Sequence, residues 1–310
     1  MSHQLSDKDF KLYLANARSQ IEGVFSISQE KNIDYGYQFQ ITDGGSKLTL
    51  NVYNGKKGLN PVFAGDKNLE AKVREVLGNH PVNIAAEHTE RYGDANVWAG
   101  SDESGKGDYF GPLVVAAVIV DKNTFGKLSA AGVKDCKLLS DKKILELEDV
   151  ILQNVVDAAV LELKPHIYNM RYEQVVAQGG KLNQLLGLGH IAALTQVLNR
   201  HPETERALID QFTNSSENVR VLQQRFPNCK ISQTPRAEAD LAVAAASVLA
   251  RARFLRAIKQ LSERAGLGDI PKGGGEHVRE YARAIVKKFG EGELRNYVKL
   301  HFANTGKISD

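Results

Sequence analysis

Cysteine is scarce in this sequence of 310 residues, because Cys136 and Cys229 are the only two and they lie far apart without a Cys-x-x-Cys spacing. This usage argues against a disulfide scaffold or a zinc site and is typical of a reducing cytoplasm. Long apolar runs are also missing, since no stretch reaches the roughly 18 residues that suggest a membrane span. The opening residues, MSHQLSDKDF, lack the basic and then apolar order of a secretory signal. We therefore expect a cytoplasmic protein with no membrane span.

Charge is nearly balanced over the whole chain but not along it. The formal net charge is +3, yet residues 251–310 carry 13 basic against 7 acidic side chains. A basic tail on a near-neutral body suits a polyanion partner. A solvated helical face would give the same pattern, so charge alone leaves both interpretations open.

The sequence predicts two domains joined by a linker. Residues 1–80 predict a small α+β domain, with a helix at 6–23, strands at 35–42, 47–54 and 60–65, and a helix at 67–78. Residues 81–95 show no clear period and predict the linker. Residues 96–310 predict an α/β domain, with strands at 96–102, 111–120, 206–210 and 229–234, and helices at 142–160, 182–200 and 236–265.

The stretch GSDESGKG at residues 100–107 nearly matches the phosphate-binding P-loop motif, but it lacks a residue that the motif requires. Gly107 stands where the motif needs Ser or Thr to hold magnesium. Asp102 and Glu103 would stand within a cradle that works by pointing N–H groups at phosphate oxygens. Two carboxylates there would repel the ligand, so the sequence argues against a nucleotide-binding loop.

The same two acids suit a metal site. Hard cations such as Mg²⁺ take carboxylate oxygens and keep positions open for water and phosphate. The neighbouring glycines let the backbone come close to a bulky ligand, and Lys106 could then meet its phosphate. A tight turn decorated with charge is the alternative interpretation.

Further acids are candidates to complete such a site. Asp210 closes the predicted strand RALID, where a side chain can face a crevice. Glu238 and Asp240 lie near the start of the predicted helix and point about 200° apart, so only one of them can face the site. Glu238 shares its predicted face with small alanines, which let a helix approach a sheet. We expect Asp240 instead to complement the helix dipole.

With these acids in place, the sequence resembles the type 2 ribonucleases H, and specifically bacterial ribonuclease HIII. The resemblance covers residues 97–310 and rests on long, ordered motifs: SDESGKGDYFGPLVVAAV, GVKDCKLLSD, LIDQF, RAEADLAVAAASVLAR and KLHFANTGKI. Ribonucleases HII carry Gly-Arg-Gly where this chain has Gly105-Lys106-Gly107, and they usually place Asp fourth in the acid set. Cys136 stands where the family usually has Ser. Residues 1–80 resemble, by pattern and position, the TATA-binding-protein-like substrate-binding domain that distinguishes ribonuclease HIII.

The resemblance implies a ribonuclease H-like catalytic domain, with a mixed central sheet flanked by helices. It also implies an endoribonuclease that requires Mg²⁺ or Mn²⁺, hydrolyses the RNA strand of RNA/DNA hybrids and leaves 3′-hydroxyl and 5′-phosphate ends. Two metal ions bridged by carboxylates can supply an activated water and stabilise the leaving 3′ oxygen. The expected partner is therefore hybrid nucleic acid, and we expect the protein to be a monomer.

The expected site residues follow from the same resemblance. Catalysis and metal binding are expected of Asp102, Glu103, Asp210 and Glu238. Asp102 is expected to bridge the ions, and Glu103 either to ligate a metal or to position the attacking water. Contacts to substrate are expected from Ser104, Gly105, Lys106, Gly107, Arg251 and Lys272. His190 lies on an apolar helix face and is interpreted as a core histidine.

Two points stay open at this level. The strand aromatics of the first domain, Tyr35, Tyr37, Phe39 and Tyr53, could pack in its core or stack on nucleotides. Two other functions also remain: a ribonuclease HII-like enzyme that prefers single ribonucleotides embedded in DNA, and a non-catalytic hybrid-binding protein. The presence of all four acids argues against the last.

Overall fold

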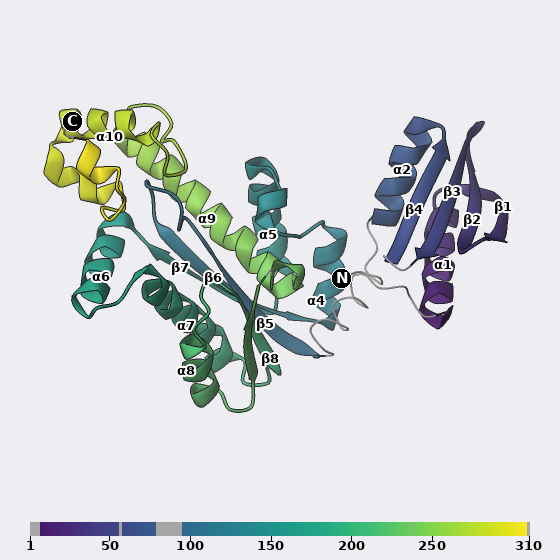
Figure 1. Ribbon diagram of the computed structural model, residues 1–310, viewed down its shortest axis with the longest axis horizontal. Helices are drawn as coiled ribbons and strands as arrows, with labels where there is room; N and C mark the ends of the chain where they lie inside the picture. The colour runs from purple at the N-terminus through teal and green to yellow at the C-terminus, as the bar shows by residue number, and fades with distance from the viewer. Residues whose placement is uncertain (1–6, 56–57, 79–94, 236, 309–310) are drawn as a thin grey trace. The chain divides into compact units, whose positions relative to one another are not determined.

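The structure is a computed structural model that describes residues 7–55, 58–78, 95–235 and 237–308, and it divides into two compact units (Figure 1). The units are Met1–Glu87 and His88–Asp310. The predicted linker at 81–95 lies, apart from Ala95, outside the described residues. Within the described residues, no helix combines the length and apolar character needed to cross a membrane.

The first unit is a four-stranded antiparallel sheet with two helices packed on one face. Its strands run in the order β1 (Ser26–Ile33), β2 (Gly36–Asp43), β3 (Ser46–Gly55) and β4 (Gly58–Gly65), and its helices are α1 (Asp7–Glu22) and α2 (Lys67–Gly78). Side chains alternate along a strand, so Leu48, Leu50 and Val52 enter the core beneath the helices. The intervening residues of β3, such as Asn51, lie on the opposite face.

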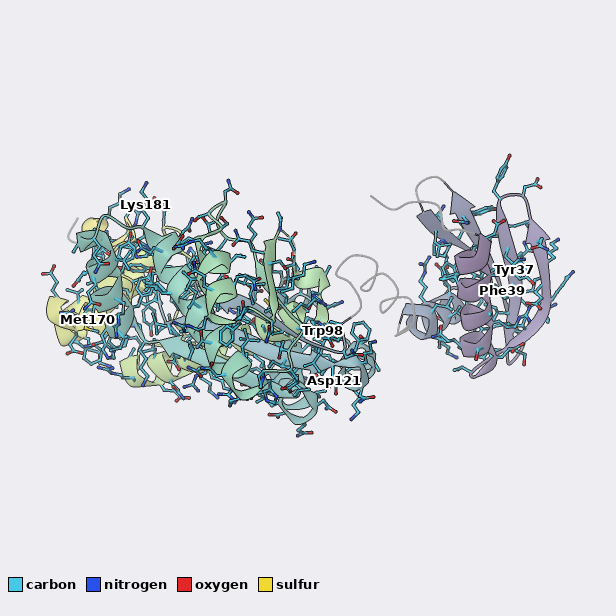
Figure 2. All side chains as sticks on the ribbon, turned by 90° about the horizontal axis from the view of Figure 1, so that it is seen from below. Tyr37, Phe39, Trp98, Asp121, Met170 and Lys181 are labelled. Atoms are coloured by element: carbon cyan, nitrogen blue, oxygen red, sulfur yellow. The ribbon has the colours of Figure 1, made fainter. Side chains whose placement is uncertain are left out.

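The aromatics of this unit have mixed positions. Phe39 is fully buried in the core, and the Tyr37 ring packs 5.1 Å from it, centroid to centroid (Figure 2). Tyr35 is exposed in a turn. Sequence patterning missed β1, because this edge strand exposes most of its side chains and has no regular apolar alternation.

The second unit is built on a mixed five-stranded sheet. Its strands lie in the order β7 (Asp157–Leu163), β6 (Leu113–Asp121), β5 (Val97–Ser104), β8 (Arg206–Asp210) and β9 (Lys230–Thr234). Strand β6 is antiparallel to both β7 and β5, whereas β8 and β9 run parallel to β5. Smaller helices are α4 (Lys122–Ala130), α5 (Asp141–Asn154), α6 (Pro165–Ala177), α8 (Glu217–Arg225) and α10 (Val278–Phe289).

Two long helices cover the two faces of this sheet. Helix α7 (Leu182–Arg200) packs on the face that carries Ala99, Val115 and Ala117. Helix α9 (Leu241–Ala265) packs on the other face, where Gly100 lets it come close. A Cβ atom at Gly100 would lie 2.3 Å from the backbone nitrogen of Val243. The expected α/β architecture of a mixed sheet between helices is confirmed.

Two predicted helices have the wrong extent. The helix predicted at 142–160 ends at Asn154, and residues 157–163 form the edge strand β7, which pairs with β6 along its whole length. The helix predicted from 236 begins at Leu241. Asp240 caps it, because Oδ1 accepts hydrogen bonds from the backbone N–H groups of Ala242 and Val243.

Candidate active site

Asp102 and Asp210 lie side by side at the ends of two neighbouring parallel strands. In the pairing of β5 with β8, Ser101 lies opposite Ile209, so the next residues of the two strands are the two aspartates. Neighbouring strands are about 4.8 Å apart. Asp102 is only 6% exposed. The sheet therefore brings two carboxyl groups into one largely buried space.

Glu238 reaches this space from the 3-10 turn Ala237–Ala239, just before α9. The backbone N–H of Ala237 donates to Oδ1 of Asp210 at 3.0 Å, which holds the turn against the end of β8. Oε2 of Glu238 is buried and has no hydrogen-bond partner among the described residues. The predicted reason for its orientation, a helix face shared with alanines, is wrong, because Glu238 precedes the helix.

Glu103 points to the opposite face of the sheet from Asp102, because successive strand side chains alternate. Its Oε2 lies 3.1 Å from Nε2 of His190 on α7. The other ring nitrogen of His190 lies 2.9 Å from Oγ of Ser101, and the ring stacks on Phe212 with centroids 5.0 Å apart. His190 is fully buried, as expected of a core histidine, but its partner is a candidate catalytic acid.

The carboxyl groups shift one another's ionisation. Burial, and then the charges of Glu103 and Asp210, raise the pKa of Asp102 well above its ordinary value. Burial also raises the pKa of Asp210, and the Glu238 charge adds to this, while the hydrogen bond from Ala237 opposes it. Burial alone would raise the pKa of Glu103, but the hydrogen bond and charge of His190 outweigh it and leave the pKa lowered. Crowded carboxylates of this kind favour a nearby cation.

Lys137 is the basic residue that sequence reasoning missed. Burial lowers its pKa, but the charges of Asp135, Asp102, Glu238 and Asp210 outweigh burial and raise it. Its ammonium group therefore balances part of the acidic cluster. The segment GVKDCKLLSD contains this lysine, but it lies 35 residues after Asp102, and no local pattern joins the two.

The four acids fit a divalent cation on two observations. The buried oxygen of Glu238 has no partner among the described residues, and the pKa of Asp102 is raised by its neighbours. Across the part of the chain that is described, no three carboxylate, imidazole or thiolate groups already form a ligand set around one point.

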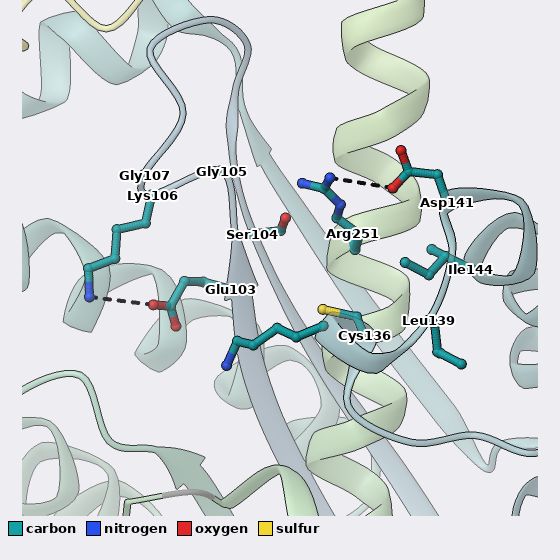
Figure 3. Close-up of a pocket in the computed structure, with 11 residues that line it drawn as sticks. Glu103, Ser104, Gly105, Lys106, Gly107, Cys136, Leu139, Asp141, Ile144 and Arg251 are labelled. Atoms are coloured by element: carbon teal, nitrogen blue, oxygen red, sulfur yellow. Dashed lines mark hydrogen bonds and ion pairs between the residues drawn. The ribbon is translucent and has the colours of Figure 1, made fainter. Parts of the chain in front are cut away.

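The glycine loop after β5 lines a cavity of about 380 Å³, and Glu103 is the one of the four acids that borders it. Its predicted contact residues Ser104, Gly105, Lys106, Gly107 and Arg251 all border the cavity (Figure 3). Nζ of Lys106 lies 3.7 Å from Oε1 of Glu103 on one side of β5. Lys272 does not line the cavity, but its Nζ donates to Asp141, which does. Cys136, at the position that departs from the resembled family, also lines the cavity, as a free thiol.

The glycine loop is fixed by its own backbone geometry at Gly105 and by hydrogen bonds from Lys299 near the C-terminus. Gly105 has φ +89°, a left-handed conformation that favours glycine, and a Cβ there would lie 2.3 Å from the carbonyl oxygen of Pro112. The buried Nζ of Lys299 donates to the carbonyl oxygens of Asp108 and Gly111, both at 2.8 Å. These contacts fix the loop, and with it the cavity wall.

Comparison with known proteins identifies close counterparts. A sequence model of the family Ribonuclease HII matches residues 99–305. The ribonuclease HIII of Protochlamydia amoebophila (strain UWE25) is 35% identical over 241 residues, which are 77% of this chain and 75% of that protein. The ribonuclease HIII of Bacillus velezensis is 40% identical over 210 residues, 67% of this chain and 66% of that protein. The crystal structure of Bst-RNase HIII in complex with Mn²⁺ is 29% identical, with a TM-score of 0.64 over 99% of this chain and 96% of that one.

Proposed function

The chain belongs to the ribonuclease HII family, and from this premise we propose an active site in which two metal ions are held by four acids: Asp102, Glu103, Asp210 and Glu238. It is an endoribonuclease of the ribonuclease HIII type, which uses Mg²⁺ or Mn²⁺ to hydrolyse the RNA strand of RNA/DNA hybrids, leaving 3′-hydroxyl and 5′-phosphate ends. The observation that carries the site assignment is the adjacency of Asp102 and Asp210, with the unpartnered oxygen of Glu238 beside them.

The chain's own residues account for placement of the substrate. Bound divalent ions supply an activated water and stabilise the leaving 3′ oxygen. Asp102 lies beside Asp210 across the ladder and next to Glu103 in its strand, and these three acids with Glu238 would hold the ions. The loop Ser104–Gly107 presents backbone groups and the Lys106 ammonium at the cavity, where they can meet phosphates and 2′-hydroxyls.

The test of this function compares three substrates under one set of salt and metal conditions. We expect Mg²⁺- or Mn²⁺-dependent cutting of the RNA strand in a uniform hybrid, and no cutting of duplex DNA. A duplex with one embedded ribonucleotide should be a poor substrate. An arginine at position 106 could hold two acceptor atoms of an RNA–DNA junction in a fixed geometry, whereas the ammonium of Lys106 is a single flexible charge. Equal kcat/KM on the hybrid and the single ribonucleotide would favour a ribonuclease HII-like activity, and binding without cleavage would favour a non-catalytic protein.

We also propose that residues 1–80 form a substrate-binding domain, joined by a linker at 81–95 to a catalytic domain at 96–310. Support comes from the sheet face that the helices leave uncovered within this unit. The register places amide and lysine side chains on that face: Gln29, Lys31, Gln38, Gln40, Lys47, Asn51 and Asn60. Among the described strand residues this face carries no carboxylate, which suits contact with a phosphate backbone.

A double replacement tests the binding role of this face. Gln38 and Asn51 are hydrogen-bonded neighbours, Nε2 to Oδ1 at 2.7 Å. Gln38→Ala with Asn51→Ala should raise KM for the hybrid and leave kcat largely intact, because the contact is remote from the chemistry. Arg18→Ala, on helix α1 of the same unit, is the control and should leave KM unchanged. A fall in kcat at unchanged KM would contradict a binding role.

We propose a cytoplasmic monomer. Cys136 and Cys229 are both free thiols, which supports a reducing compartment. Sedimentation equilibrium at micromolar concentration should report a mass close to the 34.1 kDa of one chain. A mass of twice that value would contradict the monomer.

A further inference from the structure

Asp141 lies between two basic side chains at the edge of the cavity beside the proposed active site. Its Oδ1 accepts a hydrogen bond from Nη2 of Arg251 at 3.4 Å (Figure 3), and its Oδ2 accepts one from Nζ of Lys272. The three residues come from the start of α5, from α9 and from the segment that precedes α10. The proposed reaction uses none of these bonds.

Neighbouring groups hold Arg251 in place. The guanidinium carbon lies 5.1 Å from the ring centroid of Phe254, within the range of a cation–π contact. Phe254 is fully buried beneath Gly105, since a Cβ at Gly105 would lie 2.9 Å from its ring. Arg251 is therefore positioned against the same glycine loop that lines the cavity.

Lys272 is tied to this loop through the next residue. The backbone N–H of Gly273 donates to Oδ1 of Asp108 at 2.7 Å, and its carbonyl oxygen accepts from the N–H of Tyr109 at 2.9 Å. The backbone beside Lys272 is thus fixed to the loop by bonds that do not involve Asp141.

The carboxylate of Asp141 accepts from two donors of the kind that bind phosphate. Carboxylates and phosphates both offer oxygens to guanidinium and ammonium donors, and such donors are the usual phosphate ligands of proteins. The Asp141 side chain is 42% exposed, so the pairs can open. Burial raises the pKa of Asp141, but its hydrogen bond to Lys272 and the charges of Lys272 and Arg251 outweigh burial, which keeps the carboxylate ionised.

We propose that Arg251 and Lys272 form a site for a backbone phosphate of the nucleic acid, and that Asp141 occupies this site in the free protein as an internal competitor. The inference rests on the proposed function, because it presumes that nucleic acid enters the cavity. Any polynucleotide must displace the Asp141 carboxylate before its phosphate can bind. The competitor therefore lowers affinity for hybrid and duplex DNA by the same factor, and it limits trapping of the enzyme on non-substrate DNA.

Binding measured in chelator, where no cleavage occurs, tests this proposal. We use fluorescently labelled hybrid and duplex DNA and follow anisotropy. Asp141→Asn keeps the shape of the side chain and removes its charge. It should tighten binding of both duplexes by about threefold to tenfold, the size expected for two half-exposed ion pairs. The slope of log Kd against log salt concentration should increase by about one, because one more positive charge becomes free to contact a phosphate.

Two further variants separate this site from a general charge effect. Glu148→Gln removes the same charge from the same helix, where Glu148 pairs with Arg256 of α9 at 2.7 Å, and should leave Kd unchanged. Adding Arg251→Met and Lys272→Met to Asp141→Asn should abolish the gain. Equal tightening by Glu148→Gln would mean that only net charge matters, and would overturn the proposal.

Unchanged Kd in Asp141→Asn would overturn the competitor role, and weaker binding would show that Asp141 itself holds the substrate. Cleavage of the hybrid by the unaltered protein with Mg²⁺ is measured alongside. If that protein cuts hybrid while Asp141→Asn fails to tighten binding, only the competitor is wrong and the proposed function stands.

Discussion

Nε2 of His190 lies 3.1 Å from Oε2 of Glu103, although the two residues are 87 positions apart in the chain. Helix α7 thus reaches across one face of the sheet to hold a carboxylate of the proposed metal site. A hydrogen bond of this kind orients a metal-binding carboxylate from outside the ligand set, as partners of metal ligands commonly do.

His190→Ala should impair the use of metal more than the binding of substrate. Loss of such a partner typically costs about 10- to 100-fold in metal affinity or activity. We expect kcat to fall by about that factor, the Mg²⁺ concentration for half-maximal rate to rise, and KM for hybrid to stay nearly constant. His201→Ala replaces a histidine that pairs with Asp157 and Glu203 at the surface, and it should leave all three values unchanged. An unaltered Mg²⁺ requirement in His190→Ala would show that the histidine only fills the core.

Asp210→Asn should abolish turnover while hybrid binding persists. The change keeps the size of the side chain and removes the charge that a cation needs, so we expect kcat to fall by about 100-fold or more. Steady-state kinetics and binding in chelator measure the two effects. Retention of more than about a tenth of the activity would exclude Asp210 as a ligand.

Asp240→Asn is the matched comparison for Asp210→Asn. Asp240 is fully buried, caps α9 and pairs with Arg206 at 2.9 Å. Loss of its charge should lower the thermal midpoint by several degrees, because Arg206 loses a buried ionic partner. Activity per folded molecule should remain. If Asp240→Asn were folded but inactive while Glu238→Gln were active, Asp240 would replace Glu238 as the fourth ligand.

The two glycines of the loop should respond differently to alanine. Gly105→Ala places a Cβ 2.3 Å from the carbonyl oxygen of Pro112 at a φ of +89°, so it should lower the thermal midpoint of the second unit. Gly107→Ala meets no heavy atom within 4 Å, and should leave the midpoint unchanged. Trp98 is the only tryptophan and is buried in this unit, so its fluorescence follows the unfolding directly. Equal midpoints for the two variants would contradict the loop geometry.

Lys299 should make the stability of the second unit depend on pH. Burial lowers its pKa from 10.5 to about 7. Two N–H groups of the neutral amine match the two carbonyl acceptors that it contacts. Between pH 7 and 10.5 the unfolded chain binds more protons at this lysine than the folded one, so stability rises with pH by at most about 1.4 kcal/mol per unit.

The variant Lys299→Met removes this titration and provides the comparison. We expect the unfolding free energy of the unaltered protein, relative to that of Lys299→Met, to increase between pH 7 and pH 9. Urea titrations followed by Trp98 fluorescence measure both values. Parallel pH profiles would mean that Lys299 stays protonated in the fold.

Local sequence patterns predicted much of the fold. Helices α2 and α7 and strand β8 match the predicted bounds, because each is an apolar pattern bounded by clear breaks. The edge strands β1 and β7 were missed, since an edge strand is stabilised by pairing with its neighbour more than by its own residue pattern. Asp102, Glu103 and Asp210 were recognised as candidate catalytic acids because the glycine-rich segment and RALID are distinctive sequence patterns.

The sequence by itself determined which acids exist, that they suit a hard cation and which family the chain resembles, because residue type sets the chemistry of a ligand. Only the tertiary structure decided which groups meet. The parallel pairing of β5 with β8 places Asp102 beside Asp210, and strand alternation turns Glu103 toward His190 instead. The pairing of Asp141 with Arg251 and Lys272 spans more than 100 positions, and only the packing of α5, α9 and the loop before α10 brings these charges together.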